Sequence, residues 1–176
     1  MKTKIVAIAF MSVLSVALSK PAFTATAAPA AKAEHPVLVN IKRMSFDTAL
    51  RIGKAAIDKC RKEGVQVTVT VIDRGGDAQV VLRDTLSMDI SIPISHKKAY
   101  TAMEFNAPTS ELENRFPGAY SVPKLDELLM SAGGIPINIG GNIIGGIGVS
   151  GAPSGLTDEA CAQAGLAAVR EDLEMQ

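Results

Sequence analysis

The chain of 176 residues contains no tryptophan, and only 4% of its residues are aromatic. Its core must therefore be built from valine, isoleucine, leucine, alanine and methionine. Such an aliphatic, glycine-rich core packs thinly, and association between subunits is one way to bury more surface. Lysine plus arginine (18) equal aspartate plus glutamate (18), so the chain also lacks the basic excess that is typical of a nucleic-acid binder.

Long hydrophobic runs are scarce as well. The longest begins at Ile5 and ends at Leu18, which is too short to span a bilayer comfortably. Lys2 and Lys4 precede this run and small residues follow it, a pattern that is typical of a secretory signal peptide. We predict residues 1–27 as the signal peptide and a periplasmic or secreted mature protein without a membrane span. We expect cleavage after Ala27. Cleavage after Ala33, which also follows small residues, is the alternative.

Only two cysteines are present, and each falls on a predicted helix: Cys60 and Cys161. In an oxidising compartment such a pair can close a disulfide between the first and last helices. Two separate buried thiols are the interpretation we favour, because a bridge between helices requires Cα atoms within about 7 Å of each other. Two cysteines so far apart in sequence do not supply a structural zinc site.

Residues 28–40 are rich in alanine and proline and are predicted to be a flexible arm, followed by one domain over residues 41–176. Ser45 is typical of an N-cap, and apolar residues then recur at intervals of three and four, which predicts a helix through Cys60 that Gly64 ends.

A strand with one buried face is predicted next, because valine alternates with polar residues from Val65 to Val71. The strand ends at Asp73. Asp73 and Asp77 are interpreted as turn formers rather than metal ligands, and Ala78 to Arg83 return as the second strand of a hairpin.

The middle of the chain predicts a helix over residues 90–106, with Pro93 near its start. Ser110 and Glu113 have the spacing of a capping box for a short helix. Residues 124–130 are predicted to form a helical turn followed by a short strand.

The glycine-rich segment over residues 132–155 contains a G-x-G-x-x-G string at 146–151, which resembles a dinucleotide-binding loop. That mechanism requires a helix to begin within the motif, whereas the next expected helix cap is Thr157. We therefore predict a hairpin, with strands over 135–139 and 143–150, and a closing helix. Helices and hairpins in this order predict an α+β fold whose antiparallel sheet is covered by helices.

Three linked strings, namely VTVTVIDRGGDAQVVLRD, SIPISHKKAYTAMEFNAPTSEL and GGIPINIGGNIIGGIGVSGAPSGLTDEACAQAGLAAV, resemble the GlcG/HbpS family, also called the heme-degrading domain. The resemblance covers the chain from Ser45 to Val169. It implies a profilin-like fold, here with a sheet of about five strands, and assembly as a homo-oligomer, often an octamer. Some members bind heme, some degrade it, and others have no settled function.

Heme iron accepts histidine, methionine, tyrosine or cysteine thiolate as its axial ligand, and the porphyrin requires an apolar slot with cations for its propionates. His96, Tyr100 and Met103 are spaced to share one helix face, with His96 as the possible iron ligand. The remaining candidates for a heme site, from the same family-like segments, are Arg83, Lys97, Lys98 and Thr109. Their alternative roles are a solvated surface, the core or an interface, and helix capping for Thr109.

Three functions follow from the resemblance. The first is an exported heme-binding protein that scavenges or buffers heme or assists a redox sensor, with the sensor as a possible partner. The second is a heme-degrading enzyme, for which the sequence shows no nucleophile, base and orienting group at a recognisable spacing. The third is a binding module for small hydroxy acids without heme, since glycine-rich turns with exposed N–H groups can hold a carboxylate.

Overall fold

The computed structural model describes residues 38–116 and 122–176. The predicted signal peptide and most of the predicted arm lie outside these residues. Residues 40–176 form one compact unit. Within the described residues, no helix is both long and apolar enough to cross a bilayer.

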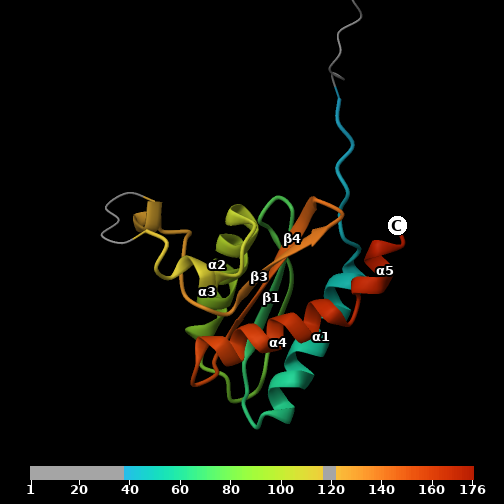
Figure 1. Ribbon diagram of the computed structural model, residues 1–176. Coiled ribbons are helices and arrows are strands. Elements are labelled where there is room, and N and C mark those ends of the chain that lie inside the picture. Colours follow the sequence, from blue (N-terminus) through green and yellow to red (C-terminus); the bar gives the residue numbers. More distant parts are fainter. Residues whose placement is uncertain (1–37, 117–121) are drawn as a thin grey trace, which may run out of the picture. The chain divides into compact units, whose positions relative to one another are not determined.

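The elements follow one another in nearly the order that the sequence predicts, and Figure 1 shows their arrangement. They are α1 (Phe46–Lys62), β1 (Thr68–Asp73), β2 (Ala78–Arg83), α2 (Ser91–Phe105), α3 (Thr109–Leu112), the 3₁₀ turn η1 (Val122–Lys124), β3 (Gly134–Ile139), β4 (Asn142–Ser150), α4 (Gly155–Ala167) and α5 (Arg170–Glu174).

Among the described residues, four strands pair antiparallel throughout, in the order β2-β1-β4-β3. The mixed helix-and-sheet class with an antiparallel sheet is confirmed, but the prediction of about five strands is wrong. The fifth was expected within 124–130, where the described chain has a turn and a loop instead. That segment lacks the alternation of apolar and polar residues that is typical of a strand. Its Leu129 N–H donates to Thr101 Oγ1 of α2, so a helix side chain provides the acceptor that a neighbouring strand would otherwise provide.

The first helix is confirmed at both ends. Ser45 is its N-cap and accepts a hydrogen bond from the Thr48 N–H, and Gly64 follows its end with a positive φ of 76°. The closing helix differs from the prediction. Its N-cap is Ser154 rather than Thr157, and it is divided into α4 and α5, because the backbone leaves helical geometry at Val169.

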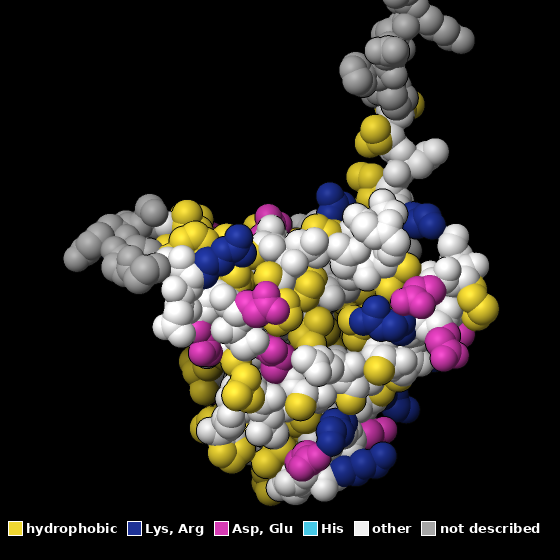
Figure 2. Space-filling model, viewed as in Figure 1, with side chains coloured by type: hydrophobic (Ala, Val, Ile, Leu, Met, Phe, Trp, Pro, Cys, Tyr) yellow, Lys and Arg dark blue, Asp and Glu magenta, His cyan; other side chains and the backbone are white. Residues whose placement is uncertain are grey.

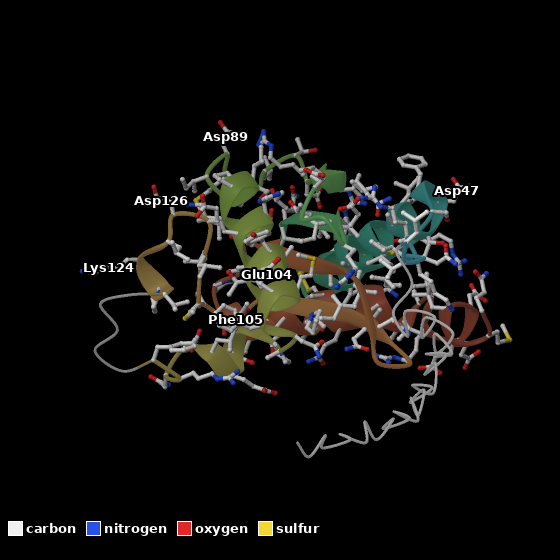
Figure 3. The ribbon with its side chains drawn as sticks, turned by 90° about the horizontal axis from the view of Figure 1, so that it is seen from above. Asp47, Asp89, Glu104, Phe105, Lys124 and Asp126 are labelled. Carbon is white, nitrogen blue, oxygen red and sulfur yellow. A yellow bond between two sulfur atoms is a disulfide. The ribbon has the colours of Figure 1, made fainter. Side chains whose placement is uncertain are left out.

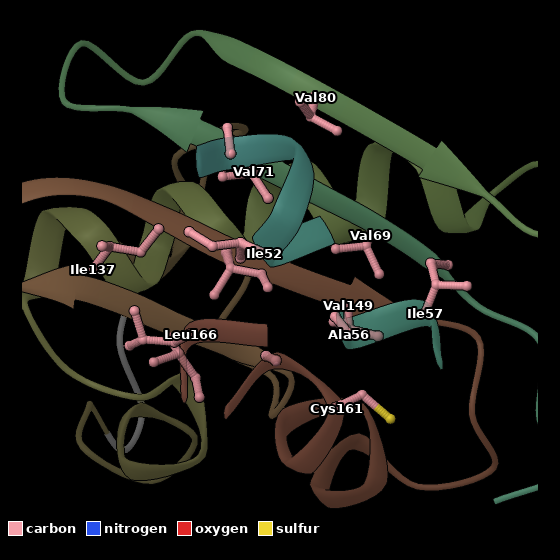
Figure 4. Close-up of a cluster of buried hydrophobic side chains, with 14 of the residues drawn as sticks. Ile52, Ala56, Ile57, Val69, Val71, Val80, Ile137, Val149, Cys161 and Leu166 are labelled. Atoms are coloured by element: carbon pink, nitrogen blue, oxygen red, sulfur yellow. The ribbon is translucent and has the colours of Figure 1, made fainter. Parts of the chain in front are cut away.

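One face of the sheet packs against α1 and α4 and forms the main apolar core (Figure 4). Val69 and Val71 of β1 and Ile147 and Val149 of β4 point into this core and are fully buried. The prediction that β1 buries only one face is wrong, since every residue of β1 is buried. The reason is that α2 covers the opposite face of the same strand.

Cys60 and Cys161 form a disulfide between α1 and α4, with their Cα atoms 5.6 Å apart. The interpretation as two separate thiols is therefore wrong. The two helices approach closely because α4 carries Gly165 at the contact, where a Cβ atom would lie 2.7 Å from the carbonyl oxygen of Ile52. This close approach brings the cysteines within bridging distance, which sequence spacing could not reveal.

The other face of the sheet consists mainly of threonine hydroxyl groups and glycines, with Ile72 as an apolar exception, and α2 packs directly on it. Thr70 bonds to Ser95 at 2.7 Å, and Thr68 bonds to Ser91 at 2.6 Å. A Cβ atom on Gly148 would lie 2.0 Å from the Ser95 carbonyl oxygen. The glycines of the G-x-G-x-x-G string thus allow a helix to touch a strand, which agrees with the predicted hairpin and leaves no phosphate-binding loop there.

Candidate functional site

The side of α2 nearer the rest of the domain carries a buried ion pair. Lys98 Nζ lies 3.1 Å from Asp158 Oδ2 of α4, and the two side chains are 5% and 4% exposed. Lys98 also donates to the carbonyl of Val149, while Asp158 accepts from the Ala152 N–H. The ammonium group is therefore fully engaged inside the domain, and its predicted role as a partner for heme propionates finds no support in this geometry.

Burial raises the pKa of the Asp158 carboxyl above its ordinary value. The hydrogen bond from Ala152 and the charge of Lys98 act in the opposite direction, but loss of hydration is the larger effect. The pair consequently joins α2 to α4 at an electrostatic cost to the carboxylate.

A second buried carboxylate lies beside this pair and holds the segment that contains Thr109. Glu159 accepts from the N–H and the hydroxyl of Ser110 and from the N–H of Gly133. Thr109 Oγ1 accepts from the Gly134 N–H at 2.8 Å. The N-cap of α3 is Pro108, so neither the predicted capping box nor helix capping by Thr109 occurs. Thr109 is fully buried as a link between α3 and β3.

The three predicted candidates for the axial ligand lie along α2. His96 and Tyr100 are half-buried, and Met103 is buried against Ile72 and Ala99. Within residues 38–116 and 122–176, the His96 ring and the Tyr100 hydroxyl have no hydrogen-bond or ion-pair partner. The Tyr100 ring lies over the β1–β2 turn, where a Cβ atom on Gly76 would lie 2.7 Å from a ring carbon. The structure thus brings Tyr100 and Met103 together and leaves the phenol available.

An apolar groove of about 380 Å3 runs between the C-terminal half of α2 and the segment that begins with η1. Figure 3 shows Glu104 and Phe105 on α2, and Lys124 and Asp126 on the segment across from them. The groove is lined by Tyr100, Glu104, Phe105, Val122, Leu125, Glu127 and Leu128. Its volume is within the range of small-molecule sites, and its aliphatic and aromatic walls suit a flat apolar ligand.

A second groove of about 410 Å3, which we name the arginine groove, lies at the end of α2 and over the β1–β2 turn. It is lined by Ile41, Arg43, Arg74, Gly75, Met103, Glu104 and Ile143. Glu104 lines both grooves, so they adjoin along α2. An apolar groove beside a cationic one is an arrangement that suits an amphiphilic anion.

Arg83 and Lys97 do not line either of these grooves. Arg83 lines a separate groove between α1 and β2, where it donates to Ser87 and pairs with Asp89. Its neighbours there are also paired, since the Arg61 guanidinium holds the pKa of the Asp84 carboxyl below its usual value through a hydrogen bond. Lys97 is half-buried on α2.

Charged side chains of both signs are interspersed on the face of the molecule seen in Figure 2. In the described part of the chain, no group of three or more histidine, cysteine or acidic side chains is placed to hold a metal ion. Asp73 behaves as predicted, since its Oδ1 accepts the N–H groups of Gly75 and Asp77 and so shapes the turn.

The chain folds into a small antiparallel domain that is covered by helices, and two adjoining grooves along α2 form its candidate ligand site. Residues 44–167 match the family model described as "Haem degrading protein HbpS-like". The chain belongs to this HbpS-like family, which confirms the resemblance to GlcG/HbpS proteins.

Solved structures support the same assignment. A double mutant of HbpS from Streptomyces reticuli is 38% identical, with a TM-score of 0.72 over 80% of this chain and 97% of that chain. The structure titled "Crystal Structure of PduOC:Heme Complex" is 30% identical, with a TM-score of 0.67 over 72% of this chain and 95% of that chain. The corrinoid adenosyltransferase PduO of Salmonella typhimurium is 28% identical over 86% of this chain, which spans 45% of that protein's length.

Sequence reasoning missed four of the residues that line the grooves next to Tyr100: Arg43, Arg74, Leu125 and Leu128. They come from three segments far apart in the chain, and only Arg74 lies within a family-like string. The available signal was weak: apolar residues within 125–130 that fit neither a helix nor a strand period.

Proposed function

We propose that this protein binds heme and is exported, acting as a scavenger, as a buffer or as an accessory to a redox sensor. The observation that carries the proposal is the half-buried Tyr100, whose hydroxyl has no partner among the described residues and which borders the apolar groove. The heme complex of the similar PduOC chain supports the same ligand class.

The residues along the outer side of α2 fit heme by their chemistry. A phenol and an imidazole both belong to the known axial ligands of heme iron, and Tyr100 and His96 supply them one helical turn apart. Bound heme would supply an iron centre capable of one-electron chemistry. The chain would contribute the axial ligand, an apolar wall of Phe105 and Leu128, and exclusion of water from one porphyrin face.

A second copy of the chain is part of this proposal. The apolar groove is open on one side, so a flat porphyrin lying in it would leave its other face in water. Covering that face with another subunit would bury more apolar surface. This supports a homo-oligomer, as the family resemblance implies, with heme held close to an interface.

Titration with hemin tests the proposal. The wild type should give a Soret band that saturates, and Tyr100→Phe or His96→Gln should shift that band or weaken binding about tenfold if the substituted group is the ligand. Phe46→Leu changes an aromatic residue that is exposed on α1 and should have no effect. If the wild-type spectrum does not change with hemin, the proposal is wrong.

The disulfide supports the proposed export. Such bonds persist in oxidising compartments and are rare in the cytosol. Expression of the full chain should yield a mature protein in the periplasm or medium, with a mass that corresponds to cleavage after Ala27 or Ala33. A full-length protein retained in the cytosol would contradict this part of the proposal.

Two other functions share the same surface. The family description names heme degradation, so any loss of heme absorbance should be repeated with catalase, which removes the contribution of free peroxide. The arginine groove favours a small carboxylic acid as the alternative ligand. A thermal-shift comparison of hemin with hydroxy acids separates these ligands, because a ligand of the folded state raises the melting temperature.

A further inference from the structure

The arginine groove has a polar rim and an apolar floor. Arg43 comes from the segment before α1 and Arg74 from the β1–β2 turn, and both residues line the same groove. The floor is formed by Met103 of α2 and Ile143 of β4, which also pack near each other in the small apolar cluster around Ile72.

Arg43 pairs with a buried carboxylate that is itself held by hydrogen bonds. Asp73 is buried, with a side chain that is 8% exposed, and its Oδ1 is bound by two N–H groups of the turn. Its Oδ2 lies 3.1 Å from Arg43 Nη1. A guanidinium has five N–H donors, so this single ion pair leaves several of them free to face the groove.

Arg74 is held through the backbone instead. Its Nη1 donates to the carbonyl of Ile143 at 3.2 Å, which places the guanidinium over the start of β4. Among the described residues Arg74 has no carboxylate partner. Two guanidinium groups that are already oriented, one of them without a counter-charge, form a site to which a carboxylate can bind with a small loss of side-chain freedom.

Glu104 is the one acidic side chain among the residues that line this groove. It is exposed, and within the described chain it has no hydrogen-bond or ion-pair partner. Because like charges repel, Glu104 should weaken the binding of an anion that the two arginines favour. The groove therefore contains groups whose removal should change affinity in opposite directions.

We propose that Arg43 and Arg74 bind a carboxylate group of the ligand, whose apolar part rests on Met103 and Ile143. The carboxylate belongs either to a propionate of heme bound along α2, which rests on the proposed function, or to a free small carboxylic acid. Both sources share the same contact, and the experiment distinguishes them.

The experiment measures the dissociation constants of hemin, heme dimethyl ester and a small hydroxy acid by titration of the full mature protein. For the ligand whose carboxylate contacts the two arginines, Arg74→Ala should weaken binding about fivefold. The double variant Arg43→Ala/Arg74→Ala should weaken binding of that ligand further. Glu104→Gln should strengthen binding of the same ligand about twofold, an effect that misfolding cannot imitate. Arg170→Ala, an exposed arginine on α5, is the matched control and should leave all affinities unchanged.

If heme is the source, the dimethyl ester should bind the wild type more weakly than hemin and should not respond to Arg74→Ala. If a free acid is the source, hydroxy-acid binding should respond to the arginine substitutions while any hemin binding should not. If every ligand binds the Arg43→Ala/Arg74→Ala variant as tightly as the wild type, the inference is wrong, and the response of hemin to Tyr100→Phe still decides the proposed function separately. Absence of binding by all three ligands would overturn both.

Discussion

The two faces of the sheet are built from different kinds of residue. The face toward α1 and α4 consists of branched aliphatic side chains, with the disulfide between the two helices. The face toward α2 consists mainly of threonine hydroxyls and glycines that meet serines of the helix, beside a small apolar cluster around Ile72. The first face stabilises the domain through buried apolar area. The second face allows a helix and a strand to approach closely, because its small residues leave room for the helix backbone.

This difference explains why the grooves lie along α2. A helix that rests on glycines and is tied by hydroxyl groups has little freedom to shift, so the backbone positions from which its other side chains project are fixed. Tyr100, Met103 and Glu104 lie on such a helix. The aliphatic face stabilises the domain, and the α2 face positions the residues of the candidate site.

The largest expected effect comes from adding one methyl group on the α2 face. Gly148→Ala would place a carbon atom 2.0 Å from the backbone oxygen of Ser95, and backbone cannot move aside as a side chain can. We expect a loss of about 4 kcal/mol or more in the free energy of unfolding. Urea denaturation followed by circular dichroism measures it.

Two variants serve as controls for that prediction. Val149→Ala, the next residue, removes methyl groups from the opposite face and should cost about 2 kcal/mol through lost burial. Gly141→Ala adds a methyl group where no atom lies within 4 Å, at a φ of +82°, and should cost about 1 kcal/mol. Equal stability of Gly148→Ala and the wild type would show that the close contact with α2 is not essential.

The aliphatic face can be tested through the disulfide. The Cys60→Ala/Cys161→Ala double variant releases a cross-link that spans 101 residues, which should lower the free energy of unfolding by about 3 kcal/mol. The measurement is the urea midpoint of the oxidised wild type against that of the variant. If α2 alone were responsible for the stability of the domain, the two midpoints would agree.

The ion pair between the two layers should give an effect of similar size at high pH, and this effect depends on pH. Lys98→Met leaves the buried Asp158 without a cation, which should cost about 3 kcal/mol at pH 8. The cost should decrease toward pH 4, because a protonated carboxyl needs no counter-charge.

The free energy of unfolding of the wild type should also depend on pH through Asp158. Since burial raises the folded-state pKa of Asp158, its contribution to stability is greatest below the unfolded value of 3.8 and is lost as the pH rises through the folded pKa. Denaturation of the wild type, Lys98→Met and Lys98→Met/Asp158→Asn at several pH values measures both trends. A cost for Lys98→Met that does not vary with pH would contradict this account.

Much of the candidate site was predictable from local patterns. The helix that contains His96, Tyr100 and Met103 was predicted from its sequence, and Tyr100 and Met103 do lie beside the grooves. The burial of Lys98 was not predictable, because its partners Asp158 and Val149 lie more than fifty positions away. Thr109 likewise contacts β3 rather than its own helix, which helix-capping rules do not consider.

The sequence by itself determined the elements of this protein, since the period of apolar residues, the Ser45 cap and the turns at Gly75 and Gly141 are local properties. It also carried the motifs that identify the HbpS-like family. Only the tertiary structure decided the sheet order, the disulfide, the buried ion pair and the paired grooves. These features depend on how closely helices and strands approach, and that distance is set by glycines and small side chains meeting across the fold.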